Sequence, residues 1–167
     1  DIQEILHDLN VIKPTIMYAV PRIFSKIYTG VMEKVARKPR IIQGLFHRGL
    51  ALAEKQDQHY RLTLCEKSIL GLAKKLIFKS ILEKFGGRLR LTISGASALS
   101  PKVIHFLHQI GIPLYEGYGL TETTSAITVN TQKANIVGAV GKAFEGCKIV
   151  IDTNNRITED EGEVICY

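Results

Sequence analysis

The residues with the clearest chemical potential lie between Gly117 and Glu122. The Tyr118 ring offers a face for stacking, the Thr121 hydroxyl can donate to a phosphoryl or carboxyl oxygen, and the Glu122 carboxylate is a hard oxygen ligand that suits Mg²⁺. Gly117 and Gly119 can take backbone conformations closed to other residues and let a flat ligand approach closely. Together these features indicate a nucleotide site. From spacing alone, a glycine-rich turn with an exposed Thr-Glu pair explains the segment equally well.

A strand, a helix and a second strand are expected to position this segment. Residues 88–94 alternate apolar side chains as strands do, and Ser100 is a typical helix cap for the helix that follows. Residues 114–118 then form the second strand, which makes the unit a βαβ unit with parallel strands. Ligands bind at the carboxyl ends of parallel strands, so residues 95–97 and the glycine-tyrosine segment should meet there.

Apolar periodicity predicts the other elements of an α/β fold, in which helices flank a parallel sheet and a short antiparallel β segment ends the chain. The expected elements are a helix tail at 2–9, a buried parallel strand at 15–20, a helix that starts at Pro21 and stops at 37–40, a mostly helical excursion at 41–85 with a polar break at 56–59, and strands at 126–129, 148–152 and 163–167.

Length and composition favour one globular domain. The chain has 167 residues, of which 46% are hydrophobic and 23% charged. Its start lacks the basic region and apolar run of a signal peptide, and no stretch reaches the roughly 18 apolar residues of a membrane span. The three cysteines are far apart and lack metal-ligand spacing, which fits a reducing cytosol. We therefore expect a cytoplasmic protein.

The net charge of +6 is concentrated in residues 61–90, which hold eight Lys and Arg against Glu66 and Glu83. Such a block can face nucleic acid, an acidic membrane surface or an anionic substrate, but a solvated helix face explains it as well. Few aromatic residues accompany the lysines, so we expect no nucleic acid polymer as partner. Peripheral membrane association and formation of a homodimer are left open.

Five segments, in order, resemble motifs of the adenylate-forming superfamily, which includes acyl-CoA synthetases, luciferases and peptide-synthetase adenylation domains. They are residues 14–24, 92–99, 117–123, 137–142 and 162–164. One such motif is weak, whereas five in the right order along nearly the whole chain are specific. The helical excursion at 41–85 resembles the helical insertion of long-chain acyl-CoA synthetases and favours that branch. The resemblance implies that residues 1–147 belong to the AMP-binding α/β domain and that residues 148–167 begin a small β-subdomain.

The resemblance also assigns roles around ATP or AMP. Adenine would lie between a backbone segment and the Tyr118 ring, with the backbone of Glu116 and Gly117 at its edge. Thr121 would contact the α-phosphate and Glu122 would bind Mg²⁺, which makes these two the catalytic residues. The carboxylate would enter beside the motif's two glycines. The nucleotide-binding residues implied are Gly95, Ala96, Ser97, Glu116, Gly117, Tyr118, Gly119 and Thr121. For Ser97 and Glu116, a role in supporting the loops is the alternative.

The implied activity is that of a long-chain fatty-acid–CoA ligase, which uses ATP to convert a fatty acid to an acyl-adenylate and then transfers the acyl group to coenzyme A. The superfamily's phosphate loop, its ribose-binding Thr-Gly-Asp and its C-terminal catalytic lysine are not in these residues. We therefore expect this chain alone to be inactive. Alternatives are a ligase that makes acyl-adenylates for a carrier protein, a ligase for another carboxylate, and a non-catalytic nucleotide-binding or membrane-surface module.

Overall fold

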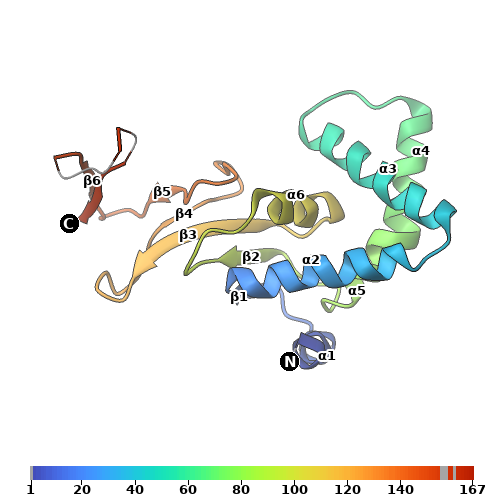
Figure 1. The fold of residues 1–167 in the computed structure, drawn as a ribbon, viewed down its shortest axis with the longest axis horizontal. Helices are drawn as coiled ribbons and strands as arrows, with labels where there is room; N and C mark the ends of the chain where they lie inside the picture. The colour runs from blue at the N-terminus through green and yellow to red at the C-terminus, as the bar shows by residue number, and fades with distance from the viewer. Residues whose placement is uncertain (1, 155–157, 160) are drawn as a thin grey trace.

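The computed structural model describes residues 2–154, 158–159 and 161–167. A five-stranded sheet forms the middle of the molecule, and helices pack against its first three strands (Figure 1). In chain order the elements are α1 (Ile2–Ile12), β1 (Ile16–Ala19), α2 (Pro21–Ala36), α3 (Arg40–Asp57), α4 (Leu64–Ala73), the π-helix η1 (Lys74–Phe78), α5 (Lys79–Glu83), β2 (Leu91–Ser94), α6 (Pro101–Ile110), β3 (Leu114–Leu120), β4 (Ser125–Val129), β5 (Lys142–Ala143), β6 (Ile149–Asp152) and β7 (Glu163–Cys166).

The sheet has the order β1-β2-β3-β4-β5 and changes direction at β3. Strands β1, β2 and β3 are parallel, with Ser94 of β2 opposite Ala19 on one side and Glu116 on the other. Strands β4 and β5 continue the sheet in antiparallel pairing. The predicted βαβ unit is therefore confirmed as β2–α6–β3. Strands β6 and β7 form a separate antiparallel sheet at the end of the molecule far from α3 and α4, as expected for the C-terminal segment (Figure 1).

Residues with special backbone preferences set several helix boundaries. Helix α2 begins at Pro21, and α6 begins at Pro101 and ends at Gly111, whose φ of 95° lies in the left-handed region. Ser100 occupies the cap position of α6 as predicted, but its side chain makes no capping hydrogen bond. Helix α1 runs three residues beyond the predicted end, to Ile12.

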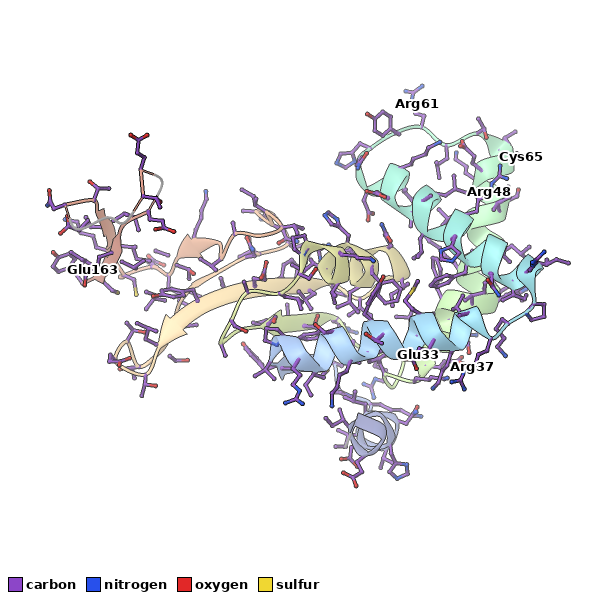
Figure 2. The ribbon with its side chains drawn as sticks, viewed as in Figure 1. Glu33, Arg37, Arg48, Arg61, Cys65 and Glu163 are labelled. Carbon is purple, nitrogen blue, oxygen red and sulfur yellow. The ribbon has the colours of Figure 1, made fainter. Side chains whose placement is uncertain are left out.

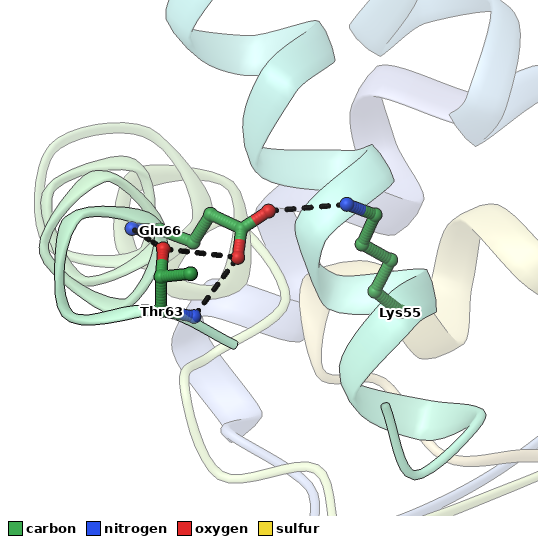
Figure 3. Close-up of polar contacts among 3 residues, drawn as sticks. All are labelled: Lys55, Thr63 and Glu66. Carbon is green, nitrogen blue, oxygen red and sulfur yellow. Dashed lines mark hydrogen bonds and ion pairs between the residues drawn. The ribbon is translucent and has the colours of Figure 1, made fainter. Parts of the chain in front are cut away.

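The helical excursion is confirmed as two amphipathic arms joined by a loop. Helix α4 starts with a capping box, in which the Thr63 hydroxyl accepts from the Glu66 N–H and the Glu66 carboxylate accepts from the Thr63 N–H (Figure 3). Lys55 of α3 donates to the same carboxylate at 3.1 Å and joins the two arms. Hydrogen bonds from the Thr63 backbone, then from Lys55 and the Thr63 hydroxyl, lower the pKa of Glu66 from 4.5 to about 2.

Aromatic residues from four helical elements build the core beside the sheet. Phe46 of α3 is fully buried and makes ring contacts with Phe78 of η1 and Phe106 of α6, with centroids 6.2 and 6.4 Å apart. Tyr28 of α2 meets Phe106 edge to face at 5.1 Å. These contacts connect the helical excursion to the sheet-covering helices α2 and α6.

Strand β1 is exposed on one of its two faces. Thr92 and Ser94 of β2 are buried on the face that carries α2 and α6, whereas Ile16 and Tyr18 of β1 are 54% and 74% exposed on the other. The prediction that residues 15–20 form a buried strand is therefore wrong as to burial, although β1 is parallel to its neighbour. Ile16 and Tyr18 of this edge strand are thus left in solvent.

Among the residues that the structure describes, no helix combines the length and apolarity required to cross a bilayer.

Candidate nucleotide-binding site

The glycine-tyrosine segment forms the second half of β3 and the turn into β4. The strand extends to Leu120, two residues further than predicted, and pairs with β4 through a register shift between Tyr118 and Gly119. Thr121 and Glu122 follow in the turn and are exposed. This turn projects beyond the ends of the parallel strands, at the end of the sheet opposite the helical arms (Figure 1).

The glycines of β3 serve packing rather than an unusual conformation. Neither Gly117 nor Gly119 has a positive φ, so the expectation that they take conformations closed to other residues is wrong. A Cβ atom on Gly119 would lie 2.0 Å from the Ser125 carbonyl oxygen, and one on Gly117 would lie 3.1 Å from that of Thr128. The absence of side chains therefore lets the β4 backbone come close to β3.

The Glu116 side chain joins two loops to β3. Its side chain is 6% exposed, and its carboxylate accepts from the N–H of Leu99 at 3.1 Å and from the N–H of Gly138 at 3.2 Å. Leu99 belongs to the loop after β2, and Gly138 to the loop before β5. The Glu116 side chain thus supports both loops, whereas a nucleotide contact of its backbone stays a prediction. Its backbone carbonyl accepts from the Asn130 N–H at 2.8 Å.

We expect Glu116→Ala to lower the free energy of unfolding by about 2 kcal/mol or more, because each buried donor left without an acceptor costs about 1–3 kcal/mol. Glu116→Gln keeps one carbonyl oxygen and should lose less. Urea unfolding of both variants measures the difference, with the exposed Glu145→Ala as a matched control that should stay within about 0.5 kcal/mol of the parent chain. Equal unfolding free energies for Glu116→Ala and Glu145→Ala would contradict the bracing role.

The turn that carries Thr121 and Glu122 is held by the next residue. The Thr123 hydroxyl accepts from the Leu120 N–H at 2.9 Å and lies 2.9 Å from the carbonyl oxygens of Leu120 and Ser125, to either of which it can donate. The Thr123 side chain is thus occupied inside the turn. The exposed side chains of Thr121 and Glu122 are left at its surface, where they can meet a ligand.

The loop after β2 reaches the same end of the sheet. Gly95 lies beside β3, because a Cβ atom there would be 3.8 Å from the Gly117 carbonyl oxygen. Ala96 has a φ of 73°, and Thr124 and Ser125 in the β3–β4 turn also have positive φ angles. Such strained conformations in residues other than glycine cluster at functional sites. The structure thus places Gly95 beside β3 and leaves Ala96 and Ser97 exposed in the loop, while Thr121 and Glu122 lie further out in the turn.

Three buried polar residues near the site were given no individual role in the sequence analysis. Asn130 is 3% exposed and holds the following loop: its side-chain amide donates to the carbonyl oxygens of Ile136 and Ala139. Its position between an apolar strand and a glycine-containing loop is the signal that could have identified it. The hydroxyls of Ser94 and Thr128 are buried and have no hydrogen-bond partner among the described residues. Thr128 looks like an ordinary strand residue in the sequence, and Ser94 lies in the segment 92–99 without a separate signal for its hydroxyl.

Glu122 is the candidate metal ligand that the turn presents. The described residues contain no group of three or more His, Cys, Asp or Glu side chains that could hold a metal ion. A single carboxylate nevertheless fits Mg²⁺, which proteins commonly bind through one or two carboxylates together with substrate phosphates. The ring of His108 in α6 contacts the Leu114 carbonyl oxygen through Nε2 at 2.8 Å.

A parallel sheet with loops gathered at its carboxyl end is the architecture of a nucleotide-binding α/β domain. The family model described as AMP-binding enzyme matches residues 1–166, and the chain belongs to this adenylate-forming family. Similar curated proteins include the peroxisomal long chain acyl-CoA synthetase 6 of Arabidopsis thaliana, 35% identical over 150 residues that make up 89% of this chain and 20% of the synthetase. The long-chain-fatty-acid–CoA ligase FadD15 of Mycobacterium bovis is 29% identical over 99% of this chain and 26% of its own length.

Solved structures with the same fold include o-succinylbenzoate CoA synthetase of Bacillus subtilis. Its complex with the acyl-adenylate OSB-AMP matches 99% of this chain and 25% of the synthetase, with 18% identity and a TM-score of 0.57. Its complex with ATP and magnesium ion matches with 16% identity and a TM-score of 0.55. The chain thus spans about a fifth to a quarter of the length of the relatives that it matches.

Proposed function

We propose that this chain supplies nucleotide-binding elements of a long-chain fatty-acid–CoA ligase. The reaction joins a fatty acid to the α-phosphate of ATP, releases pyrophosphate, and then passes the acyl group from AMP to the thiol of coenzyme A. The observation that carries the proposal is the exposed Thr121-Glu122 pair, held by Thr123 at the end of the sheet, in a chain whose similar curated proteins include long-chain acyl-CoA synthetases.

Within this proposal the described residues bind and orient the nucleotide. The Tyr118 ring and the backbone of residues 95–97 hold adenine, with the backbone of Glu116 and Gly117 at its edge. The Thr121 hydroxyl donates to the α-phosphate and orients it toward the entering carboxylate. Holding the two reactants in a fixed geometry lowers the entropic cost of bringing them together. Magnesium, held by Glu122 when bound, would neutralise charge on the phosphates. The fatty acid enters beside Gly117 and Gly119, whose lack of side chains leaves room.

The location and associations of the enzyme are part of the proposal. We place it in the cytoplasm and at the surface of membranes. The Lys and Arg residues of segment 61–90 are all exposed, which supports contact with anionic headgroups. Strand β1 has a free edge and exposed apolar residues, which supports self-association of the chain.

Carboxylate-dependent exchange of radiolabelled pyrophosphate into ATP tests the proposed activity. We expect none from the 167-residue chain alone, since it spans only part of its relatives, and clear exchange with long-chain fatty acids from a protein that carries the chain within a full ligase. Exchange by the purified chain alone would contradict the predicted inactivity. Exchange by the longer protein with other carboxylates but with no fatty acid would contradict the substrate class.

A further inference from the structure

A groove lies at the opposite end of the sheet from the β3–β4 turn. It runs between α2 and the continuous η1–α5 helix, with His7 and Asn10 of α1 at its side, and encloses about 860 Å³. We call it the α2–α5 groove. Figure 2 shows two of its lining residues, Glu33 and Arg37, near the C-terminal end of α2.

The floor of the α2–α5 groove is apolar. Helix α2 contributes Ile27 and Val35, the facing helix contributes Ile77 and Ile81, and Phe85 follows in the turn after α5; all five are at most 9% exposed. The members from each helix are four or eight positions apart, so each helix presents one stripe to the groove. From Ile27 to Val35 the stripe is about 12 Å long at 1.5 Å per residue. An extended alkyl chain fits such a strip.

The rim at one end of this strip is strongly basic. Lys34, Lys38 and Lys84 line the groove together. Lys26 and Arg37 add two more cations, and Glu33 is the one acidic residue in the lining. Burial, and then the positive charges of Lys34 and Lys38, lower the pKa of Lys84. Cations held this close repel one another, and an anion between them would remove that repulsion.

The wall opposite α2 is irregular in a way that shapes the groove. Residues Lys74–Phe78 form a π-helix, whose Lys74 carbonyl oxygen accepts from the Lys79 N–H, five residues on. Leu76 and Ile77 of this stretch and Ser80 of α5 line the groove, and Leu76 stays 54% exposed. Single π-turns inside α-helices occur frequently at functional sites. The π-helix is an observation independent of the lysine cluster, and it lies in the wall of the same groove.

We propose that the α2–α5 groove binds a single-chain lipid with a phosphate head, the chain along the apolar floor and the phosphate at Lys34, Lys38 and Lys84. A phosphate carries more negative charge than a carboxylate and accepts hydrogen bonds from three ammonium groups at once. The groove lies at the end of the sheet opposite Thr121 and Glu122, so this ligand leaves the proposed nucleotide site free (Figure 1).

Titration calorimetry with dodecyl phosphate below its micelle concentration tests the ligand class. We expect dodecyl phosphate to bind more tightly than inorganic phosphate by on the order of tenfold or more, because each buried methylene adds to the affinity. Dodecyltrimethylammonium, with the same chain and the opposite charge, should not bind. Equal affinities for dodecyl phosphate and inorganic phosphate would mean that the groove binds only the phosphate group. Binding to phosphatidate vesicles without binding of monomeric dodecyl phosphate would assign the lysines to a membrane surface. Either outcome overturns the proposal.

Matched variants locate the binding. Lys34→Gln together with Lys84→Gln should weaken dodecyl phosphate binding by on the order of tenfold or more, through lost charge-assisted hydrogen bonds. Lys67→Gln together with Lys75→Gln removes the same charge outside the groove lining and should leave binding within about twofold. If both double variants weaken dodecyl phosphate binding equally, the phosphate does not bind at Lys34 and Lys84.

A groove-filling variant tests the chain position without touching a charge. Gly30 lines the groove and has open space where a Cβ would stand, as has the exposed Gly71 on α4 outside it. Gly30→Leu should therefore fold, with a melting temperature at or above that of the parent chain, and lose the preference for dodecyl phosphate over inorganic phosphate. Gly71→Leu should keep that preference. Unchanged dodecyl phosphate affinity in a folded Gly30→Leu chain would refute a lipid chain in the groove.

Discussion

Glu122→Gln in the proposed ligase is expected to lower the rate of acyl-adenylate formation by about 10²–10³-fold, the loss found when one electrostatic stabiliser is removed. The substitution keeps the size of the side chain and its hydrogen bonding but removes the negative charge. Glu122 is exposed in a turn whose backbone is held by the Thr123 hydroxyl, so its charge is not needed for the hydrogen bonds of that turn. The fold should therefore remain intact while the Mg²⁺ requirement rises.

Pyrophosphate–ATP exchange measured across a range of Mg²⁺ concentrations checks this expectation. The matched control is Glu145→Gln, an exposed carboxylate in the loop after β5, which should leave both rate and Mg²⁺ dependence unaltered. A melting temperature equal to that of the parent protein shows that the turn is preserved. If Glu122→Gln and Glu145→Gln behave alike, Glu122 has no metal role and the Thr-Glu pair is an ordinary exposed turn.

Gly119→Ala is expected to have the largest effect on stability, a loss of about 3 kcal/mol or more in the free energy of unfolding. The new Cβ would lie 2.0 Å from the Ser125 carbonyl oxygen and 2.5 Å from the Ala126 Cα. Both atoms belong to the backbone of the paired strand, which cannot move aside as the end of a flexible side chain can. Strands β3 and β4 must separate, and the turn that presents Thr121 and Glu122 moves with them.

Gly95→Ala is the matched control, since its Cβ would make only an ordinary contact, 3.8 Å from the Gly117 carbonyl oxygen. Urea unfolding should give a free energy within about 0.5 kcal/mol of the parent chain for Gly95→Ala and a much lower value for Gly119→Ala. An unchanged unfolding midpoint for Gly119→Ala would mean that the two strands do not pack as closely as the structure indicates.

Local signals in the sequence were sufficient for most of the elements. Pro21 and Pro101 mark helix starts because proline suits the first helical position, and Gly111 marks a helix end because it adopts a left-handed φ. Apolar spacing at period 3.6 predicted the helical arms between residues 41 and 85. The order of five short motifs was enough to recognise the family, because such motifs are read along the chain without knowledge of contacts.

What depends on contacts between distant residues was decided only by the tertiary structure. Glu116 reaches Leu99 and Gly138, 17 and 22 residues away, and nothing in its sequence neighbourhood specifies those partners. In β2 the polar Thr92 is buried while the apolar Ile93 is only half-buried, because the helices cover a single face of the sheet. Likewise, the lysines of the α2–α5 groove come from segments about 50 residues apart and meet only when α2 packs beside α5. The sequence by itself determined the elements and the family, whereas the packing of helices on one face of the sheet decided which side chains meet.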